Sequence, residues 1–391
     1  MFALAITLVV APLIIAAYAY VLYPSILWVV ARLGRPTAAA KPIDEWPTLT
    51  LTVPVYNAVK TIRRTLTTLL EVDYPKDRLQ LLVLSDASDD GTDDVVREFS
   101  AAGVELLRAP SRQGKTAAEN AAITVARGEI IVNVDATISI PGPSLKHLVR
   151  VFGDPSIGVA SGRDVSVGAG DGSATKGESS YTSYEMWLRD LETRAGCIVG
   201  ASGCFYGIRR SIRGKPLPPG LSWDFASTLV ARQQGYRSVS VPEAVCFVPR
   251  AVDVRIELRR KSRTMARGLS TLFHFGDLMN PLRYGSFALM LVSHKLLRWV
   301  PFLLAPVAVV ALAVLAPHSD AASLVLGITG LGLLVGAAAI VHRGGISFKP
   351  AALAGFIVAA SAAGFLAWID AIRGTRLATW EPTTRPGVLP G

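Results

Sequence analysis

Long apolar runs at both ends of the chain enclose a central block in which apolar and polar positions alternate. Residues 2–30 are almost all apolar and carry no charge. This run exceeds the roughly 20 residues that a helix needs to cross a bilayer. Further long apolar runs cover 296–316, 321–341 and 351–369. The pattern predicts an N-terminal membrane anchor and about three C-terminal spans on either side of a soluble block.

The distribution of basic residues predicts which side of the membrane the block occupies. Arg32, Arg35 and Lys41 follow the first apolar run. By the positive-inside rule, the block after this run is cytoplasmic and the N-terminus faces out. Three further spans would then leave the C-terminal tail outside, although the tail carries Arg373 and Arg376, which prefer the inside. The sequence leaves the side of the C-terminus open.

Within the block, short β-branched stretches alternate with stretches of helical spacing. Strands are predicted at 49–55, 79–84, 104–107 and 129–134, and helices at 59–71, 92–100 and 116–126. Such alternation favours an α/β fold with a mostly parallel, Rossmann-like sheet covered on both faces. Ligands then bind at the carboxyl ends of the strands. A Gly-rich stretch at 168–177 is expected to be a mobile loop.

Composition narrows the class of partner. The chain has 391 residues, is 51% hydrophobic and carries a formal net charge of +10. A basic balance suits anionic lipid or a nucleotide-diphosphate substrate. Nucleic acid is disfavoured because no stretch interleaves aromatic residues with a basic run. The cysteines form no Cys-x-x-Cys pair, so we expect reduced thiols and no zinc site.

Two acidic residues directly follow predicted strands. Asp135 comes after I-I-V-N-V, and Asp86 begins the run D-A-S-D-D-G-T. A single carboxylate at a strand end suits Mg²⁺, which keeps waters and substrate phosphates as its other ligands. Asp86 is placed to accept hydrogen bonds from a ribose or a base. For both residues the alternative is a turn-forming Asp.

Two helix starts carry further candidate chemistry. Lys115 opens the segment G-K-T-A-A-E-N, where a cation beside a helix N-terminus suits a phosphate. This segment is no P-loop, because the earlier Gly at Walker spacing is missing. Asp224, in S-W-D-F, is a candidate general base. Its alternative role is that of an acidic residue in the first turn of a helix.

Together, these motifs in this order resemble the family 2 glycosyltransferases, membrane-anchored enzymes of the GT-A fold related to cellulose, chitin, hyaluronan and poly-N-acetylglucosamine synthases. The likeness covers residues 51–299 and includes V-P-V-Y-N-A, S-D-A-S-D-D-G-T-D, R-Q-G-K-T-A-A-E-N, G-A-S-G-C-F-Y-G and W-D-F. It implies an anchor at 1–31, a cytosolic GT-A domain at 42–250, basic interface helices at 251–284, transmembrane helices at 285–373 and a tail at 374–391.

The resemblance also implies roles for individual residues. Those for the nucleotide-sugar, a UDP-sugar, are Pro54, Tyr56, Asp86, Lys115 and Asp135, and Asp135 would also hold Mg²⁺ or Mn²⁺. Those for the acceptor are Gly203, Cys204 and Trp223. Asp224 would deprotonate the acceptor hydroxyl for an inverting attack, while Arg260 and Arg263 would clamp the leaving diphosphate. The basic stretch around these arginines equally suits a helix lying on anionic lipid.

Two departures from the family pattern keep alternatives open. Thr137 stands where a second metal-binding Asp is usual, and Thr264 replaces a Trp associated with the growing polymer. The main expectation is a multi-pass cell-membrane enzyme that extends a polysaccharide or oligosaccharide, alone or with a partner subunit. Transfer of a single sugar to a lipid acceptor is one alternative. An inactive GT-A module that binds a nucleotide-sugar as a regulatory subunit is the other.

Overall fold

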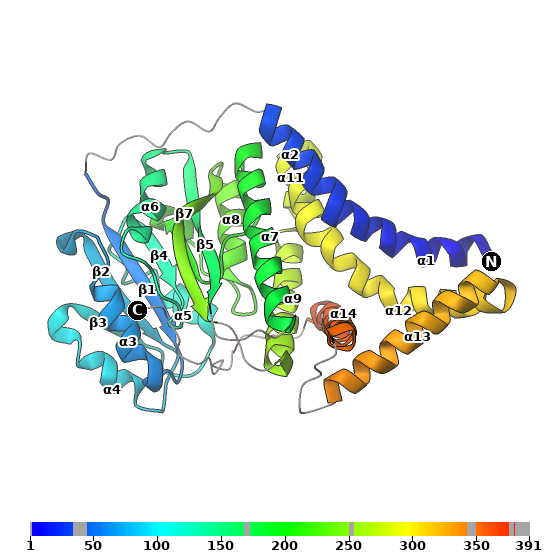
Figure 1. Ribbon diagram of the computed structural model, residues 1–391. Helices are drawn as coiled ribbons and strands as arrows, with labels where there is room; N and C mark the ends of the chain where they lie inside the picture. The colour runs from blue at the N-terminus through cyan, green and yellow to red at the C-terminus, as the bar shows by residue number, and fades with distance from the viewer. Residues whose placement is uncertain are drawn as a thin grey trace. The chain divides into compact units, whose positions relative to one another are not determined.

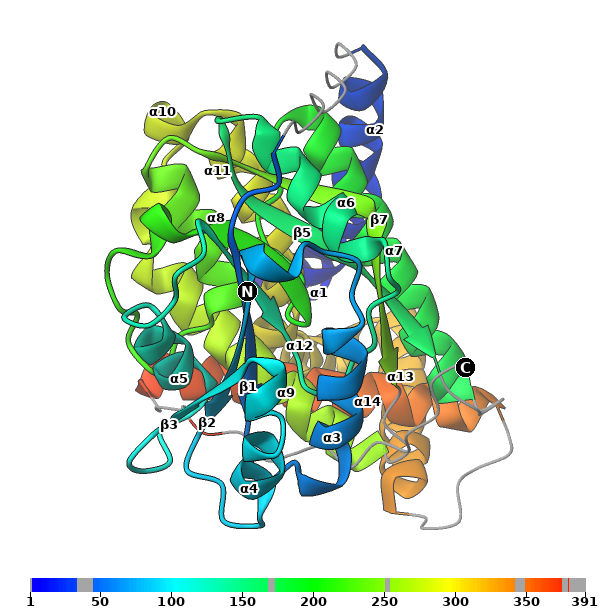
Figure 2. The same cartoon turned by 90° about the vertical axis from the view of Figure 1, so that its left-hand side faces the viewer.

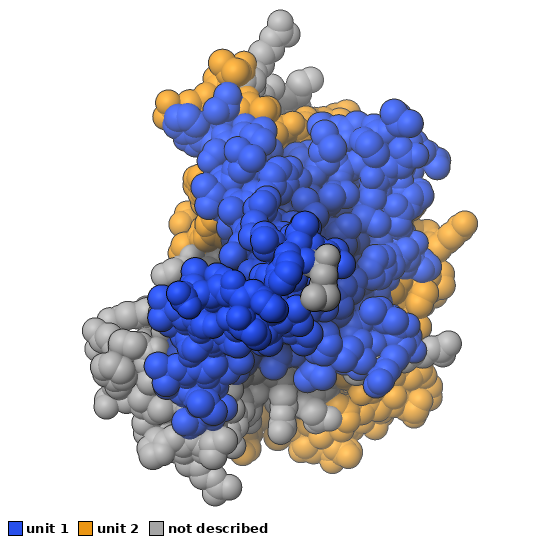
Figure 3. Space-filling view, turned by 90° about the vertical axis from the view of Figure 1, so that its right-hand side faces the viewer, with its two compact units in different colours: residues 1–29, 170–178, 253–375 blue, residues 30–169, 179–252, 376–391 orange. Residues whose placement is uncertain are grey.

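The computed structural model describes residues 2–33, 45–167, 173–249, 254–341, 349–374 and 379. The chain divides into two compact units, coloured separately in Figure 3. Unit 1 comprises residues 1–29, 170–178 and 253–375, and unit 2 comprises 30–169, 179–252 and 376–391. Unit 2 contains the strands, whereas the long apolar helices belong mainly to unit 1.

A mixed, mostly parallel sheet forms the centre of unit 2 (Figure 1). Over the described residues its strands follow the order β3-β2-β1-β4-β6-β5-β7. They are β1 (Leu49–Val55), β2 (Leu79–Ser85), β3 (Val104–Arg108), β4 (Ile130–Val134), β5 (Ile157–Val167), β6 (Phe205–Arg209) and β7 (Arg237–Pro249). Only β6 among them runs antiparallel to its neighbours, β4 and β5. The predicted α/β class with a mostly parallel sheet is confirmed.

Helices cover both faces of this sheet (Figure 2). Those of unit 2 are α3 (Val59–Leu70), α4 (Thr92–Arg97), α5 (Lys115–Ala122), α6 (Ser144–Arg150), α8 (Trp223–Gln233) and most of α7 (Ser173–Ala195). Helices α3, α4 and α6 share one hydrophobic core with the odd-numbered positions of β1. Helix α5 packs on β2, and α8 on β4 to β6, on the opposite face. Burial on both faces explains why β1 reads as a nearly continuous apolar run.

One element differs from the sequence prediction. The stretch 168–177 is predicted to be a loop, but residues 173–177 form the first turns of α7. Residues 168–172 of that stretch lie outside the described residues. A glycine inside a helix costs only about 1 kcal/mol relative to alanine, which a helix of 23 residues offsets elsewhere along its length.

Unit 1 is helical. It contains α1 (Phe2–Ala17), most of α2 (Tyr23–Leu33), α9 (Val254–His274), α10 (Pro281–Tyr284), α11 (Ser286–Leu291), α12 (Leu297–Leu315), α13 (Asp320–Val341) and α14 (Lys349–Arg373). Among the described residues, three helical stretches are long and apolar enough to cross a membrane: Phe2–Leu33, Ser286–His318 and Asp320–Ala338. Helix α1 packs along α12, and the Tyr18 hydroxyl lies 2.9 Å from Ser293 Oγ. A span at α14 stays a prediction.

Candidate active site

The candidate site lies where the strand order reverses at the centre of the sheet. Strand β1 has β2 on one side and β4 on the other, and all three are parallel. Tyr56, Asp86 and Asp135 directly follow the carboxyl ends of these strands. This edge is where open α/β sheets bind their ligands. Pro54 belongs to β1 and is buried there, so its contact with a nucleotide stays a prediction.

Asp86 anchors the loop that leads into α5. Its side chain is fully buried, and its oxygens accept hydrogen bonds from the backbone N–H groups of Gln113 at 2.7 Å and Gly114 at 2.9 Å. Gly114 has φ of +95°, a conformation that favours glycine. The carboxylate therefore fixes the turn immediately before Lys115. Its predicted contact with a uridine is untested, since each oxygen retains a further lone pair.

Tyr56 has a cationic neighbour that sequence reasoning missed. The guanidinium carbon of Arg112 lies 3.9 Å from the centre of the Tyr56 ring, within the range of a cation–π contact. Arg112 immediately precedes the Gln113–Gly114 turn held by Asp86. The planar Tyr–Arg pair thus lies beside the anchored loop, where a flat base and an anionic phosphate both find suitable partners.

Lys115 connects the strand end to the acceptor-side loop. Its Nζ lies 2.6 Å from Asp135 Oδ1 and donates to the carbonyl of Gly203 at 3.1 Å. Burial on its own would lower the pKa of this ammonium, but the charges of Asp135, Glu119 and Asp224 raise it well above its ordinary value. Lys115 is therefore a permanent cation with carboxylates around it.

Asp224 lies on the other side of Gly203. It occupies the first turn of α8, where the Ser222 hydroxyl donates to its Oδ1. A Cβ atom added to Gly203 would come within 3.0 Å of Asp224 Oδ2. The loop around Gly203 is itself fixed by Ser202, whose Oγ accepts hydrogen bonds from the N–H groups of Cys204 and Phe205. Asp224 is both a first-turn residue, as the alternative predicted, and a half-buried carboxylate beside this loop.

The predicted acceptor residues differ in their surroundings. Gly203 and Cys204 are half-buried, and the Cys204 carbonyl accepts from the N–H of Asp135 at 3.0 Å. Trp223 is only 2% exposed, and its indole N–H donates to Asn120 at 2.8 Å. The guanidinium of Arg213 stacks on the other part of this contact, 4.2 Å from the Trp223 ring centre. Trp223 therefore packs in the core, and its acceptor contact stays a prediction.

A buried polar layer lies behind Lys115 and was not foreseen. Glu119, Tyr206 and Arg213 are at most 2% exposed. Within the part of the chain that the structure describes, Glu119 Oε1, the Tyr206 hydroxyl and Arg213 Nε have no hydrogen-bond partner. Burial raises the pKa of the Glu119 carboxyl. The spacing of Lys115 and Glu119, one helical turn apart, is the one sequence signal that points to this layer.

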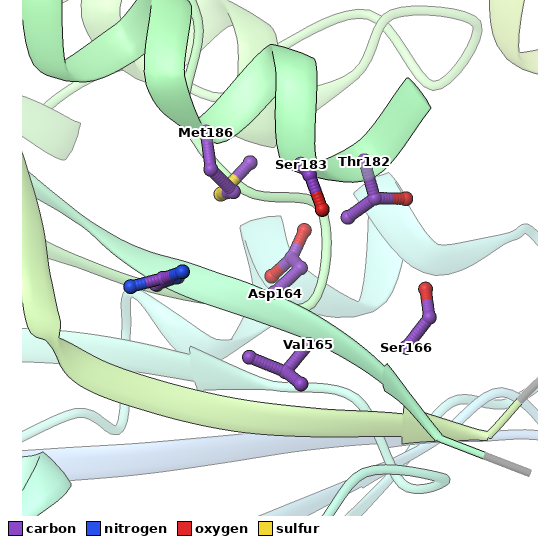
Figure 4. A pocket seen from close by; sticks show the side chains of 7 residues that line it. Asp164, Val165, Ser166, Thr182, Ser183 and Met186 are labelled. Carbon is purple, nitrogen blue, oxygen red and sulfur yellow. The ribbon is translucent and has the colours of Figure 1, made fainter. Parts of the chain in front are cut away.

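A small polar cavity lies between β5 and α7, with a volume of about 90 Å³ (Figure 4). Asp164 extends from β5 toward Ser183 of α7, as the close-up view shows. Its Oδ1 accepts from Ser202 Oγ at 2.5 Å and from Cys246 Sγ at 3.3 Å. Burial raises the pKa of this carboxyl. Through Ser202, the cavity wall is joined to the Gly203 loop.

The two predicted arginine clamps are not brought into this cluster. Arg260 and Arg263 belong to α9 in unit 1, whereas the residues around Lys115 belong to unit 2. Helix α9 packs against α14, and Ser262 Oγ donates to the carbonyl of Ala363 at 3.1 Å. Contact of these arginines with a diphosphate stays a prediction.

The donor set for a metal consists of one carboxylate. Among the described residues, no group of three His, Cys, Asp or Glu side chains is arranged to hold a metal ion. Asp135 lies at the sheet edge, and the neighbouring position of the family's second acid is Thr137. Mg²⁺ commonly binds through one or two carboxylates together with substrate phosphates. Asp135 therefore fits a divalent ion that a bound diphosphate also ligates.

Comparisons with known proteins identify the type of domain. Residues 50–214 match the family Glycosyl transferase family 2. Glycosyltransferase AglE of Haloferax volcanii is 28% identical over 142 residues, which are 36% of this chain and 47% of AglE. Beta-monoglucosyldiacylglycerol synthase of Trichormus variabilis is 26% identical over 168 residues, 42% of this chain and 36% of the synthase. The chain spans about half the length of the curated relatives it matches first.

A solved structure resembles nearly the whole chain. The mannosyltransferase PcManGT from Pyrobaculum calidifontis, in complex with GDP-Man and Mn²⁺, has a TM-score of 0.71 at 25% identity. The likeness covers 96% of this chain and 99% of that one. The matched family residues contain β1 to β4, β6, Lys115 and Gly203. The chain therefore carries a glycosyl transferase family 2 domain over residues 50–214.

Proposed function

We propose that the chain is an inverting glycosyltransferase that moves a sugar from a nucleotide-diphosphate sugar to a carbohydrate or lipid-linked acceptor. The observation that carries this proposal is the convergence of Lys115, Asp135 and Asp224 around the Gly203 loop. A leaving diphosphate needs positive charge, and an acceptor hydroxyl needs a base. The motifs favour a UDP-sugar, whereas the PcManGT structure holds GDP-Man, so both nucleotide classes belong in the test.

In this mechanism Asp224 accepts the proton of the acceptor hydroxyl. The hydroxyl oxygen then forms a bond to the anomeric carbon while the bond from that carbon to the diphosphate oxygen breaks. Because attack and departure occur on opposite faces, the anomeric configuration inverts. Lys115 offers its ammonium to the departing nucleoside diphosphate, whose negative charge grows as the bond breaks.

Asp135 would hold Mg²⁺ or Mn²⁺ jointly with the donor diphosphate. The bound ion would neutralise charge that develops on the leaving group. The Mn²⁺ in the PcManGT complex supports this assignment. Thr137 in place of a second acid is consistent with a metal that depends on the substrate phosphates for most of its ligands.

We further propose that the enzyme is a multi-pass membrane protein with its family 2 domain in the cytoplasm. The three apolar helical stretches support membrane association, and Arg32 after the first of them supports the cytoplasmic side. Helix α9 would lie at the membrane interface on anionic lipid. Arg260 and Arg263 would then face either lipid headgroups or the leaving diphosphate.

The test is release of UDP or GDP by the purified, detergent-solubilised chain, with a panel of UDP- and GDP-sugars, Mn²⁺ or Mg²⁺, and lipid extract. We expect release with one donor. Asp224→Asn should lower turnover by about 10²–10⁴-fold, the usual contribution of a general base, and Asp135→Ala should also abolish release. The control is Asp77→Asn, at a carboxylate that is 81% exposed. No release with any donor would refute the proposal.

Product size then separates polymer synthesis from single transfer. A ladder of products that lengthens with time would indicate extension of a polysaccharide or oligosaccharide. One labelled glycolipid would indicate single transfer to a lipid, the outcome that Thr264 favours. Measurable nucleotide binding without release, in the presence of every donor, would instead favour a binding module.

A further inference from the structure

Lys115 occupies the same carboxylate oxygen that a metal would use. Its Nζ lies 2.6 Å from Asp135 Oδ1, and the Gly203 carbonyl, at 3.1 Å, holds the ammonium in that position. The side chain is 24% exposed, and that of Asp135 is 32% exposed. This is a strong, charge-assisted hydrogen bond in a partly desolvated place. A divalent ion approaching Asp135 alone would meet a positive charge already in contact with its ligand.

We propose that Lys115 is the resident cation of Asp135 in the donor-free protein, and that divalent metal binds Asp135 only together with the nucleotide diphosphate. This inference rests on the proposed function, because it assigns Asp135 to the metal of a nucleotide-sugar site. With one carboxylate available among the described residues, a metal without phosphate ligands cannot outcompete the ammonium. The diphosphate supplies both additional metal ligands and an anionic partner for Lys115.

The structure also provides a second partner for the displaced ammonium. Glu119 lies four residues after Lys115 on α5, on the same face of the helix. It is 2% exposed, and its Oε1 has no hydrogen-bond partner among the described residues. A rotation of the long Lys115 side chain toward this oxygen would satisfy a buried acceptor. Lys115 can therefore leave Asp135 without its ammonium losing a protein partner.

The experiment measures Mn²⁺ binding to the full chain in detergent by electron paramagnetic resonance of free Mn²⁺, with and without UDP or GDP. The Mn²⁺–nucleotide complex in buffer is titrated separately as a blank. For wild type we expect nucleotide to tighten Mn²⁺ binding at least 5-fold, within the usual 5–150-fold range of coupling between sites. For Lys115→Met we expect nucleotide-free Mn²⁺ affinity to rise at least about 5-fold, because the competing charge is gone.

Two controls locate the effect. Lys146→Met removes another ammonium from an Asp, since Lys146 Nζ lies 2.5 Å from Asp73, and it should leave Mn²⁺ binding unchanged. The double variant Lys115→Met with Asp135→Asn should lose the gain, which would place the ion at Asp135. Lys115→Gln is the second single variant should Lys115→Met fail to fold, as judged by thermal unfolding.

The results separate this inference from the proposed function. Unchanged or weaker nucleotide-free Mn²⁺ binding in Lys115→Met and Lys115→Gln would overturn the resident-cation role. The same is true of a wild type that binds Mn²⁺ equally well with and without nucleotide. If such a protein still transfers sugar, the proposed function stands and only the inference fails. A gain of Mn²⁺ binding in a chain that binds neither nucleotide would refute the proposed function instead.

Discussion

The loop anchored by Asp86 permits a test that separates a structural role from ligand binding. We expect Asp86→Asn to destabilise unit 2 even in the absence of nucleotide. The carboxylate is fully buried and accepts two backbone hydrogen bonds, at 2.7 and 2.9 Å. A hydrogen bond to a charged group contributes about 1.5–3 kcal/mol. The amide of Asn keeps one acceptor oxygen but turns a donor toward the other N–H, so one bond is lost and one donor is left unpaired.

The expected loss in the free energy of unfolding is therefore about 2–4 kcal/mol. For a unit of this size such a loss lowers the midpoint of thermal unfolding by roughly 5–15 °C. The assay is thermal unfolding of the detergent-solubilised protein, followed by near-UV circular dichroism without nucleotide. The matched control is Asp77→Asn, whose carboxylate is 81% exposed. If Asp86→Asn melts with wild type while nucleotide binding is lost, Asp86 is a ligand alone and the anchoring argument is wrong.

Three further variants test other parts of the site. Gly203→Ala would place a Cβ 3.0 Å from Asp224 Oδ2, so we expect a large fall in turnover with a nearly unchanged melting temperature; normal turnover would contradict the placement of Asp224. Asn120→Ala removes hydrogen bonds to Leu217 and Trp223 and should cost about 2–3 kcal/mol in chemical denaturation, a loss that Thr124→Ala on the exposed surface should not reproduce. Burial would raise the pKa of Asp90, but hydrogen bonds from Thr92 and Val59 lower it overall from 3.8; its stabilisation is therefore present above this pH and is lost on acidification, and Asp90→Asn should melt less steeply with falling pH than wild type.

The strands were predictable because their signal is local. Residues 49–55 form β1 with the predicted bounds, since an apolar run buried on both faces needs no knowledge of the rest of the chain. Asp86 and Asp135 could likewise be placed at one edge, because parallel strands bring their carboxyl ends together. The antiparallel strand β6 between β4 and β5 could not be predicted, because strand order depends on long-range pairing.

The contacts around the candidate site were beyond the reach of sequence patterns for the same reason. Lys115 and Asp135 are 20 residues apart, and their contact depends on where α5 packs against the sheet. The motif suggested Trp223 as an acceptor residue, but it also fills a buried position under Arg213. Motifs of this kind record which residues matter, whereas burial decides whether a side chain meets a ligand or supports one that does.

The charges at the site explain how one metal-binding carboxylate can suffice. In the donor-free protein Lys115 neutralises Asp135, Arg213 lies near Glu119, and burial favours the neutral form of the Glu119 carboxyl. The cluster is thus close to electrical balance without any metal. A nucleotide-diphosphate donor brings negative charge that this balance does not cover, and a divalent ion arriving with it restores neutrality. A second Asp at position 137 would instead favour metal binding before the donor, so Thr137 and the Lys115–Asp135 pair are two parts of one arrangement that couples the metal to the substrate.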